Sequence, residues 1–260
     1  MKKLLVLVFA ASMALLHQSC EKSMQNDPLA ANNTLLNDST GTNPPILDTA
    51  CLNPDATYVD TWHYATPQLY IFKGTNYGRY DLTTHTYAGL NTIADGYKNV
   101  PFSTFDAVFV DVWSDSVPKL MIFSGNKVAK FDILNNIYEG VDSISSRYPG
   151  LPFTSVDALF VDTVTTYYNK QPQLYIFSGT QYARIDMNTN TYKGLNSNAL
   201  GFENAPFYTY RAMYVDRWSF GSPQLVMFNG TQNARLTYPY YNFVSSSSNT
   251  LTYPGVPFCQ

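Results

Sequence analysis

Histidine, cysteine and charged residues are scarce in this chain of 260 residues. It has three histidines and three cysteines, and Asp, Glu, Lys and Arg together make up 13% of the sequence. The few His and Cys residues show none of the spacings of a structural metal site, which argues against a zinc-bound fold. The net charge of −3 and the absence of a basic run argue against a nucleic-acid partner.

Sequence signatures of common enzymes are also missing. The chain has no nucleophile elbow and no glycine-rich phosphate loop. We therefore predict that the protein is not an enzyme. The less favoured alternative is a hydrolase built on the recurrent carboxylates Asp81, Asp132 and Asp186, which we expect instead to cap turns at the ends of strands.

What the chain does contain is one phrase of eight residues, spelled four times. Its copies are PQLYIFKG (67–74), PKLMIFSG (118–125), PQLYIFSG (172–179) and PQLVMFNG (223–230). A second phrase, of the type DAVFVD, precedes each copy and begins at residues 55, 106, 157 and 211, in steps of 51, 51 and 54. A third, ending in Pro-Phe, closes each unit. Self-similarity at a period of about 50 residues indicates a repeat architecture.

Each unit has the pattern of a small antiparallel sheet. In the third unit, DALFVD, QLYIFSG and YARIDM are short apolar and β-branched runs, the last two separated by the turn-forming SGTQ, and TYKGL adds a shorter fourth run. Four strands in about 50 residues, repeated four times, predict an all-β four-bladed β-propeller. The blades should span about 54–103, 104–153, 154–207 and 208–259.

These phrases resemble the haemopexin repeat. The matching motifs are FDAVFVD, KLMIFSG, NKVAKFD and YPGLPF, and the resemblance covers residues 51–260. Departures gather in the fourth unit, where Arg211 replaces the opening Asp, Thr237 replaces the Asp of the third strand, and VSSSSNT replaces a glycine phrase. We expect these departures to affect the outer part of the fourth blade and not the fold.

Resemblance to this family implies binding and not catalysis, without choosing a ligand, since members range from a haem-scavenging serum protein to legume seed albumins. It also implies a Ca²⁺ or Na⁺ ion at one mouth of the central channel. The main-chain carbonyls that would hold the ion belong to Asp55, Asp106, Asp157 and Arg211. Oxygen ligands suit a hard cation, although the Arg211 side chain opposes it.

The first 50 residues precede the repeats. Residues 1–19, MKKLLVLVFAASMALLHQS, have a basic start and a short apolar run, and with Cys20 they resemble a bacterial lipoprotein signal. Residues 20–50 are polar and Pro-containing, which is typical of a disordered tether. The expected location is the cell outer membrane, with the lipid on Cys20 as the only membrane contact and the domain 51–260 exposed at the surface. The alternative is an ordinary secretory signal.

Two further cysteines flank the repeats, Cys51 before the first and Cys259 after the last. In an oxidising compartment we expect them to form a disulfide that closes the ring. The same pair is found in the family that the repeats resemble. The alternative is two free thiols.

All three tryptophans occupy the same place in different units. They follow the first strand at Trp62, Trp113 and Trp218, and the third unit has a longer loop with Tyr167 and Tyr168 instead. Each loop begins with a carboxylate, and these are Asp60, Asp111, Asp162 and Asp216. Together they could form a ligand-binding face. The alternative is that each ring wedges between blades and each Asp caps its turn.

We therefore predict a non-catalytic, surface-exposed recognition module for an extracellular protein or glycan. The alternative is capture of haem or a metal ion. Removal of the signal would leave two histidines, His63 and His85, both in the first unit. We expect each of them to have a surface or packing role.

Overall fold

The computed structural model describes residues 53–115, 117–164 and 171–257. They all belong to the second of two compact units into which the chain divides, Met1–Asn32 and Asn33–Gln260. Within the described ranges the strands form four antiparallel sheets of four strands each, so the predicted all-β four-bladed propeller is confirmed. Five residues with predicted roles lie outside the described residues. They are the cysteine predicted to carry lipid, Cys20, the predicted disulfide pair Cys51 and Cys259, and the loop tyrosines Tyr167 and Tyr168.

Each blade is a meander of four strands followed by one short helix. Blade one comprises β1 (Ala56–Asp60), β2 (Gln68–Lys73), β3 (Asn76–Asp81), β4 (Thr86–Thr92) and α1 (Ile93–Gly96). Blade two comprises β5 (Ala107–Asp111), β6 (Lys119–Ser124), β7 (Lys127–Asp132), β8 (Ile137–Ser143) and α2 (Ile144–Arg147). Blade three comprises β9 (Ala158–Asp162), β10 (Gln173–Ser178), β11 (Gln181–Asp186), β12 (Thr191–Ser197) and α3 (Asn198–Gly201). Blade four comprises β13 (Ala212–Asp216), β14 (Gln224–Asn229), β15 (Gln232–Thr237), β16 (Phe243–Ser248) and α4 (Asn249–Thr252).

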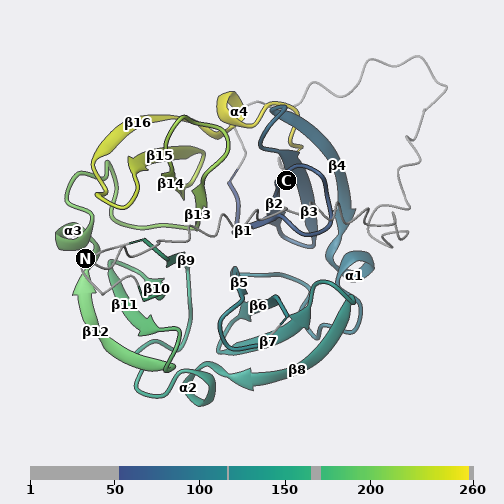
Figure 1. The fold of residues 1–260 in the computed structure, drawn as a ribbon, viewed down its shortest axis with the longest axis vertical. Coiled ribbons are helices and arrows are strands. Elements are labelled where there is room, and N and C mark those ends of the chain that lie inside the picture. The colour runs from purple at the N-terminus through teal and green to yellow at the C-terminus, as the bar shows by residue number, and fades with distance from the viewer. Residues whose placement is uncertain (1–52, 116, 165–170, 258–260) are drawn as a thin grey trace, which may run out of the picture. The chain divides into compact units, whose positions relative to one another are not determined.

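The first strands β1, β5, β9 and β13 surround the centre of the ring, and the fourth strands lie at its rim (Figure 1). Each first strand contacts the first strands of the two neighbouring blades. Apolar side chains fill the space between blades: one core cluster joins blades two and three, another joins three and four, and a third joins four and one. The ring therefore closes through packing between its first and last blades.

The recurring eight-residue phrase is the second strand and the turn after it. This strand is buried over five consecutive residues in every blade, as at Gln68–Phe72, because neighbouring blades cover both of its faces. The phrase ends on a glycine whose φ is between +55° and +58° in all four copies. Only glycine adopts this left-handed conformation without strain, which explains its recurrence at the hairpin turn.

The opening Asp of the first strand stabilises that same turn. The Oδ2 atoms of Asp55, Asp106 and Asp157 accept hydrogen bonds from the glycine N–H at 2.9, 2.7 and 2.6 Å. A hydrogen bond thus links two segments of the repeat that lie apart in the sequence, the start of the first strand and the turn after the second. In blade four Arg211 stands in place of the Asp.

The four short helices of the described residues were not predicted from the sequence. Their N-caps are Thr92, Ser143, Ser197 and Ser248, and each side-chain oxygen accepts a hydrogen bond from the backbone N–H three residues later. A Ser or Thr at one fixed place in each repeat was the available signal. No helix of the described residues is long and apolar enough to cross a membrane.

Blade four keeps its outer strand despite its departures from the repeat. In the other blades a glycine with φ between +121° and +144° lies beside a bulge, at Gly89, Gly140 and Gly194. Ser245 takes this place in β16, which pairs with β15 over its length. Because backbone pairing does not depend on the side chain, the strand forms without the glycine phrase.

Candidate binding surface and channel

The tryptophan-bearing loops share one face of the propeller, here called the upper face. It is the edge at which the first strands end and the second strands begin, and the turns between third and fourth strands lie at the same edge. The described residues predicted for the ligand-binding face therefore lie on one side of the ring. The opposite edge, with the opening residues of the first strands, is the lower face.

The four loop carboxylates are buried. Asp60, Asp111, Asp162 and Asp216 are between 0% and 3% exposed. In each loop the Oδ1 atom accepts a hydrogen bond from the backbone N–H two residues later, at 2.8 to 2.9 Å. The carboxylates thus cap turns, as the alternative expects, because a carboxylate at this place satisfies the first N–H groups of the loop, and their part in a ligand-binding face stays a prediction.

The three tryptophans differ in exposure. Trp62 and Trp113 are half-buried, and Trp113 packs against the apolar core between blades two and three. Trp218 is 38% exposed. Trp113 therefore matches the wedge alternative, and Trp218 presents the most open ring of the three.

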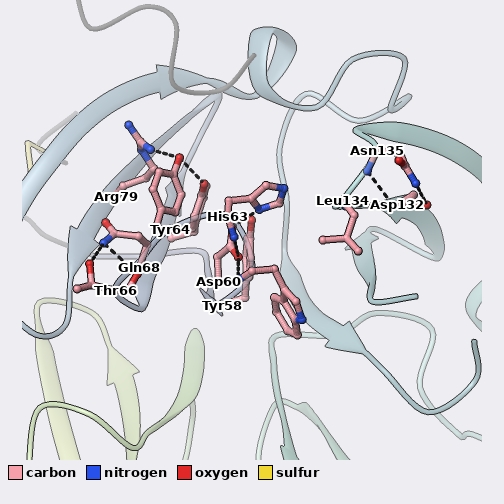
Figure 2. Close-up of polar contacts among 12 residues, drawn as sticks. Tyr58, Asp60, His63, Tyr64, Thr66, Gln68, Arg79, Asp132, Leu134 and Asn135 are labelled. Atoms are coloured by element: carbon pink, nitrogen blue, oxygen red, sulfur yellow. Dashed lines mark hydrogen bonds and ion pairs between the residues drawn. The ribbon is translucent and has the colours of Figure 1, made fainter. Parts of the chain in front are cut away.

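A side chain of the third strand holds the loop in three of the blades. In blade one Arg79 donates a hydrogen bond to the Tyr64 hydroxyl and lies 5.0 Å from the centre of the Tyr64 ring (Figure 2). In blade two Lys130 pairs with Asp115 at 2.5 Å. In blade four Arg235 lies 4.4 Å from the centre of the ring of Phe220. These three loops are thus fixed at their start by the capping Asp and near their middle by a basic side chain.

The recurrent carboxylates of the third strands cap turns, as predicted. Asp81, Asp132 and Asp186 each accept two backbone hydrogen bonds from the turn that follows. Burial alone raises the pKa of Asp81, but hydrogen bonds from the Thr66 side chain and from turn N–H groups outweigh it and lower the pKa to about 2. These carboxylates are thus engaged in structural hydrogen bonds.

The two histidines have different surroundings. Nδ1 of His63 lies 2.6 Å from the capped Asp60 carboxylate (Figure 2). His85 is exposed in the turn between β3 and β4, at a φ of +56°. Among residues 53–115, 117–164 and 171–257, no group of three His, Cys, Asp or Glu side chains is placed to hold a metal ion.

At the lower face the predicted cation residues do come together. Asp55, Asp106, Asp157 and Arg211 line a cavity of about 230 Å³ with Ser155 and Val156. The acidic side chains are already engaged by glycine N–H groups, and Asp55 also pairs with Lys73 at 2.8 Å. A hard cation here would therefore be held by the main-chain carbonyls of the four lining residues, with Arg211 opposing its charge.

Comparison with known proteins supports the fold. No protein-family model matches the chain, and no curated protein matches it in sequence. Among solved structures, the hemopexin fold protein CP4 from cow pea is 20% identical with a TM-score of 0.63, over 78% of this chain and 96% of that one. A plant albumin from Cicer arietinum showing hemagglutination is 20% identical with a TM-score of 0.63, over 77% and 95%. A plant lectin with two metal binding sites, also from Cicer arietinum, is 21% identical with a TM-score of 0.62, over 77% and 95%. The chain thus has the four-bladed fold of hemopexin-fold seed proteins.

Proposed function

We propose that the protein is a non-catalytic recognition module whose upper face binds an extracellular glycan or protein. The observation that carries the proposal is the placement of aromatic loops around one face, with the Trp218 ring 38% exposed. An exposed tryptophan offers a flat apolar ring for stacking on a sugar or for anchoring a protein partner.

Rigid loops support the same function. Because the loops of blades one, two and four are each capped by a buried Asp and tied by a basic side chain, these three loops lose little conformational freedom when a ligand binds. A catalytic role would need a free nucleophile or an acid/base pair, and the loop carboxylates are committed to their turns.

The structural neighbours agree with a glycan ligand. One of them is described as showing hemagglutination and another as a lectin. These neighbours share the fold with this chain at about one-fifth sequence identity. A glycan as the ligand of this protein is therefore part of the proposal.

A glycan array with the purified residues 51–260 tests the proposal, followed by titration calorimetry with the best ligand. We expect Trp218→Ala to weaken binding at least about tenfold, as for an exposed hot-spot aromatic ring. The matched control is Leu200→Ala, since Leu200 is 74% exposed on α3, away from the upper face. Equal binding by wild type and Trp218→Ala would contradict the upper-face site.

Capture of haem is the second candidate, favoured by His63 on the upper face. Titration with haemin should show a stoichiometric Soret shift that is lost in His63→Ala if this candidate is right. A metal ion at the lower face is the other form of the capture hypothesis.

We further propose that the protein is a lipoprotein anchored in the outer membrane through Cys20, with a Cys51–Cys259 disulfide closing the ring. The sequence pattern of residues 1–20 and the position of the cysteines on either side of the repeats support this. Metabolic labelling with a fatty acid, lost in Cys20→Ala, and non-reducing mass spectrometry test the two parts separately.

A further inference from the structure

A cavity of about 300 Å³ opens between blade four and blade one, which lie side by side in the ring (Figure 1). Blade one contributes Tyr80, Leu82 and His85, and blade four contributes polar side chains that include Arg235, Ser219, Ser247 and Thr252. This volume accommodates one sugar ring, and the lining combines hydroxyl groups with aromatic and aliphatic carbon. It is separate from the lower-face cavity and lies where the sequence departs most from the repeat.

Arg235 is held in a fixed orientation in this cavity. Its Nε donates a hydrogen bond to Ser245 Oγ at 3.0 Å, and its guanidinium lies over the Phe220 ring at 4.4 Å. Among the described residues no acidic side chain forms an ion pair with Arg235. A guanidinium fixed in this way is suited to bidentate hydrogen bonding with a carboxylate.

Blade two shows what the repeat does when this charge is neutralised. There Lys130 occupies the place of Arg235, and it pairs with Asp115 at 2.5 Å and with Glu139 at 3.3 Å. The register places Phe220 and Val244 of blade four at the positions of these two acids. Both acidic partners are thus replaced by apolar residues in blade four.

The cavity lining carries one guanidinium, Arg235, and one carboxylate, Asp216. Asp216 is 1% exposed, and its Oδ1 accepts hydrogen bonds from two turn N–H groups at 2.9 Å. The other two arginines of blade four lie elsewhere, since Arg211 lines the lower-face cavity and Arg217 donates to Thr163 of blade three. Because the Asp216 carboxylate is buried and hydrogen-bonded in its turn, Arg235 is the charge that an anionic ligand would meet.

We propose that this cavity binds a carboxylate-bearing sugar, a uronic acid or a sialic acid residue, with the carboxylate on Arg235. The Ser219 hydroxyl, which donates to the Leu82 carbonyl, and the Ser247 hydroxyl, which pairs with Thr252, would each accept a hydrogen bond from a sugar hydroxyl, and the Phe220 side of the cavity would meet the ring carbons. The proposal does not rest on the tryptophans of the upper face and would stand if these bind a protein instead.

Titration calorimetry with D-glucuronate, D-glucose and acetate tests the proposal on residues 51–260. Wild type should bind glucuronate about tenfold or more tightly than glucose or acetate, because a charge-assisted pair and the sugar contacts are both needed. Arg235→Gln should weaken glucuronate binding about tenfold or more. Arg217→Gln is the matched control, since Arg217 lies in the same blade but donates to Thr163 of blade three.

A second variant guards against misfolding of Arg235→Gln. Val244→Glu restores the acid of blade two at a residue that is 42% exposed, so the fold should be kept while the new carboxylate pairs with Arg235. Loss of glucuronate binding in a variant that melts like wild type supports the site. If wild type binds glucose and glucuronate with equal affinity, the carboxylate assignment is wrong. If it binds acetate as tightly as glucuronate, the sugar assignment is wrong. If both variants bind glucuronate like wild type, or if wild type does not bind it at all, the site itself is wrong.

Discussion

Lys119 allows a sharp test of how the blades tolerate buried charge. It replaces the glutamine found at the same place in the other three copies of the repeated phrase, and it is 5% exposed. Its Nζ lies 2.8 Å from Asp132 Oδ2 and also donates to Glu139. Asp132 keeps two backbone hydrogen bonds from the following turn, both at 3.0 Å.

Two substitutions of Lys119 separate charge from packing. Lys119→Met fills the same space but leaves the buried Asp132 without a cation, and we expect the free energy of unfolding at pH 7 to fall by about 3 kcal/mol. This is the low end for breaking a buried pair, because the backbone hydrogen bonds to Asp132 remain. Lys119→Gln restores an amide donor like that of Gln68, whose Nε2 lies 2.9 Å from Asp81, and should cost about 1 kcal/mol.

Guanidinium denaturation at several pH values measures both effects. Burial raises the pKa of Asp132, but the Lys119 hydrogen bond and those of the turn outweigh it and lower the pKa to about 2, below its ordinary value of 3.8. The stabilisation is therefore complete above pH 4 and is lost as the pH falls through about 2. The deficit of Lys119→Met should shrink over the same interval. Equal deficits for Met and Gln, independent of pH, would refute the charge argument and leave packing as the cause.

Three further outcomes are expected. Arg211→Asp should raise the affinity of the lower-face cavity for Ca²⁺ in calorimetric titration, because it replaces the opposing charge by a fourth acid; if neither this variant nor wild type binds, the channel ion is wrong. Gly96→Ala should lower the free energy of unfolding by about 2 kcal/mol, since its Cβ would lie 2.4 Å from the Tyr77 hydroxyl, and an unchanged melting curve would contradict this. Trp113→Ala should cost about 3 kcal/mol and Trp218→Ala less than about 1 kcal/mol in the same assay, because only Trp113 packs into the core between blades; equal costs would contradict the distinction.

The fold was predictable because the same strand and turn pattern occurs four times in the sequence. Each copy of the phrase at 67–74 is a buried strand that ends in a left-handed glycine, so its composition and its turn residue give the same answer. The short helices escaped prediction because four residues carry no helical periodicity. Only the capping residue, such as Thr92, marks them.

The candidate site was less accessible to sequence reasoning. That the residues of the lower cavity meet was implied by the resemblance to the haemopexin repeat, and the structure brings them together. Whether Asp162 faces solvent depends on its neighbours: its two oxygens accept hydrogen bonds from Tyr238 at 2.6 Å and Tyr241 at 2.8 Å, which come from the next blade. No pattern within one repeat contains that contact, so the choice between ligand-facing and capping carboxylates required the structure.

The concentration of unusual residues in blade four follows from how a propeller is held together. Each blade packs against its two neighbours, so a change in an outer strand affects one or two interfaces and leaves the other blades intact. Blade four lacks the opening Asp, replaced by Arg211, and the third-strand Asp, replaced by Thr237, yet its four strands still pair. A blade that can lose these structural side chains and still fold is a place where a binding site can arise at small cost in stability, and the cavity lined by Arg235 lies in that blade and its neighbour.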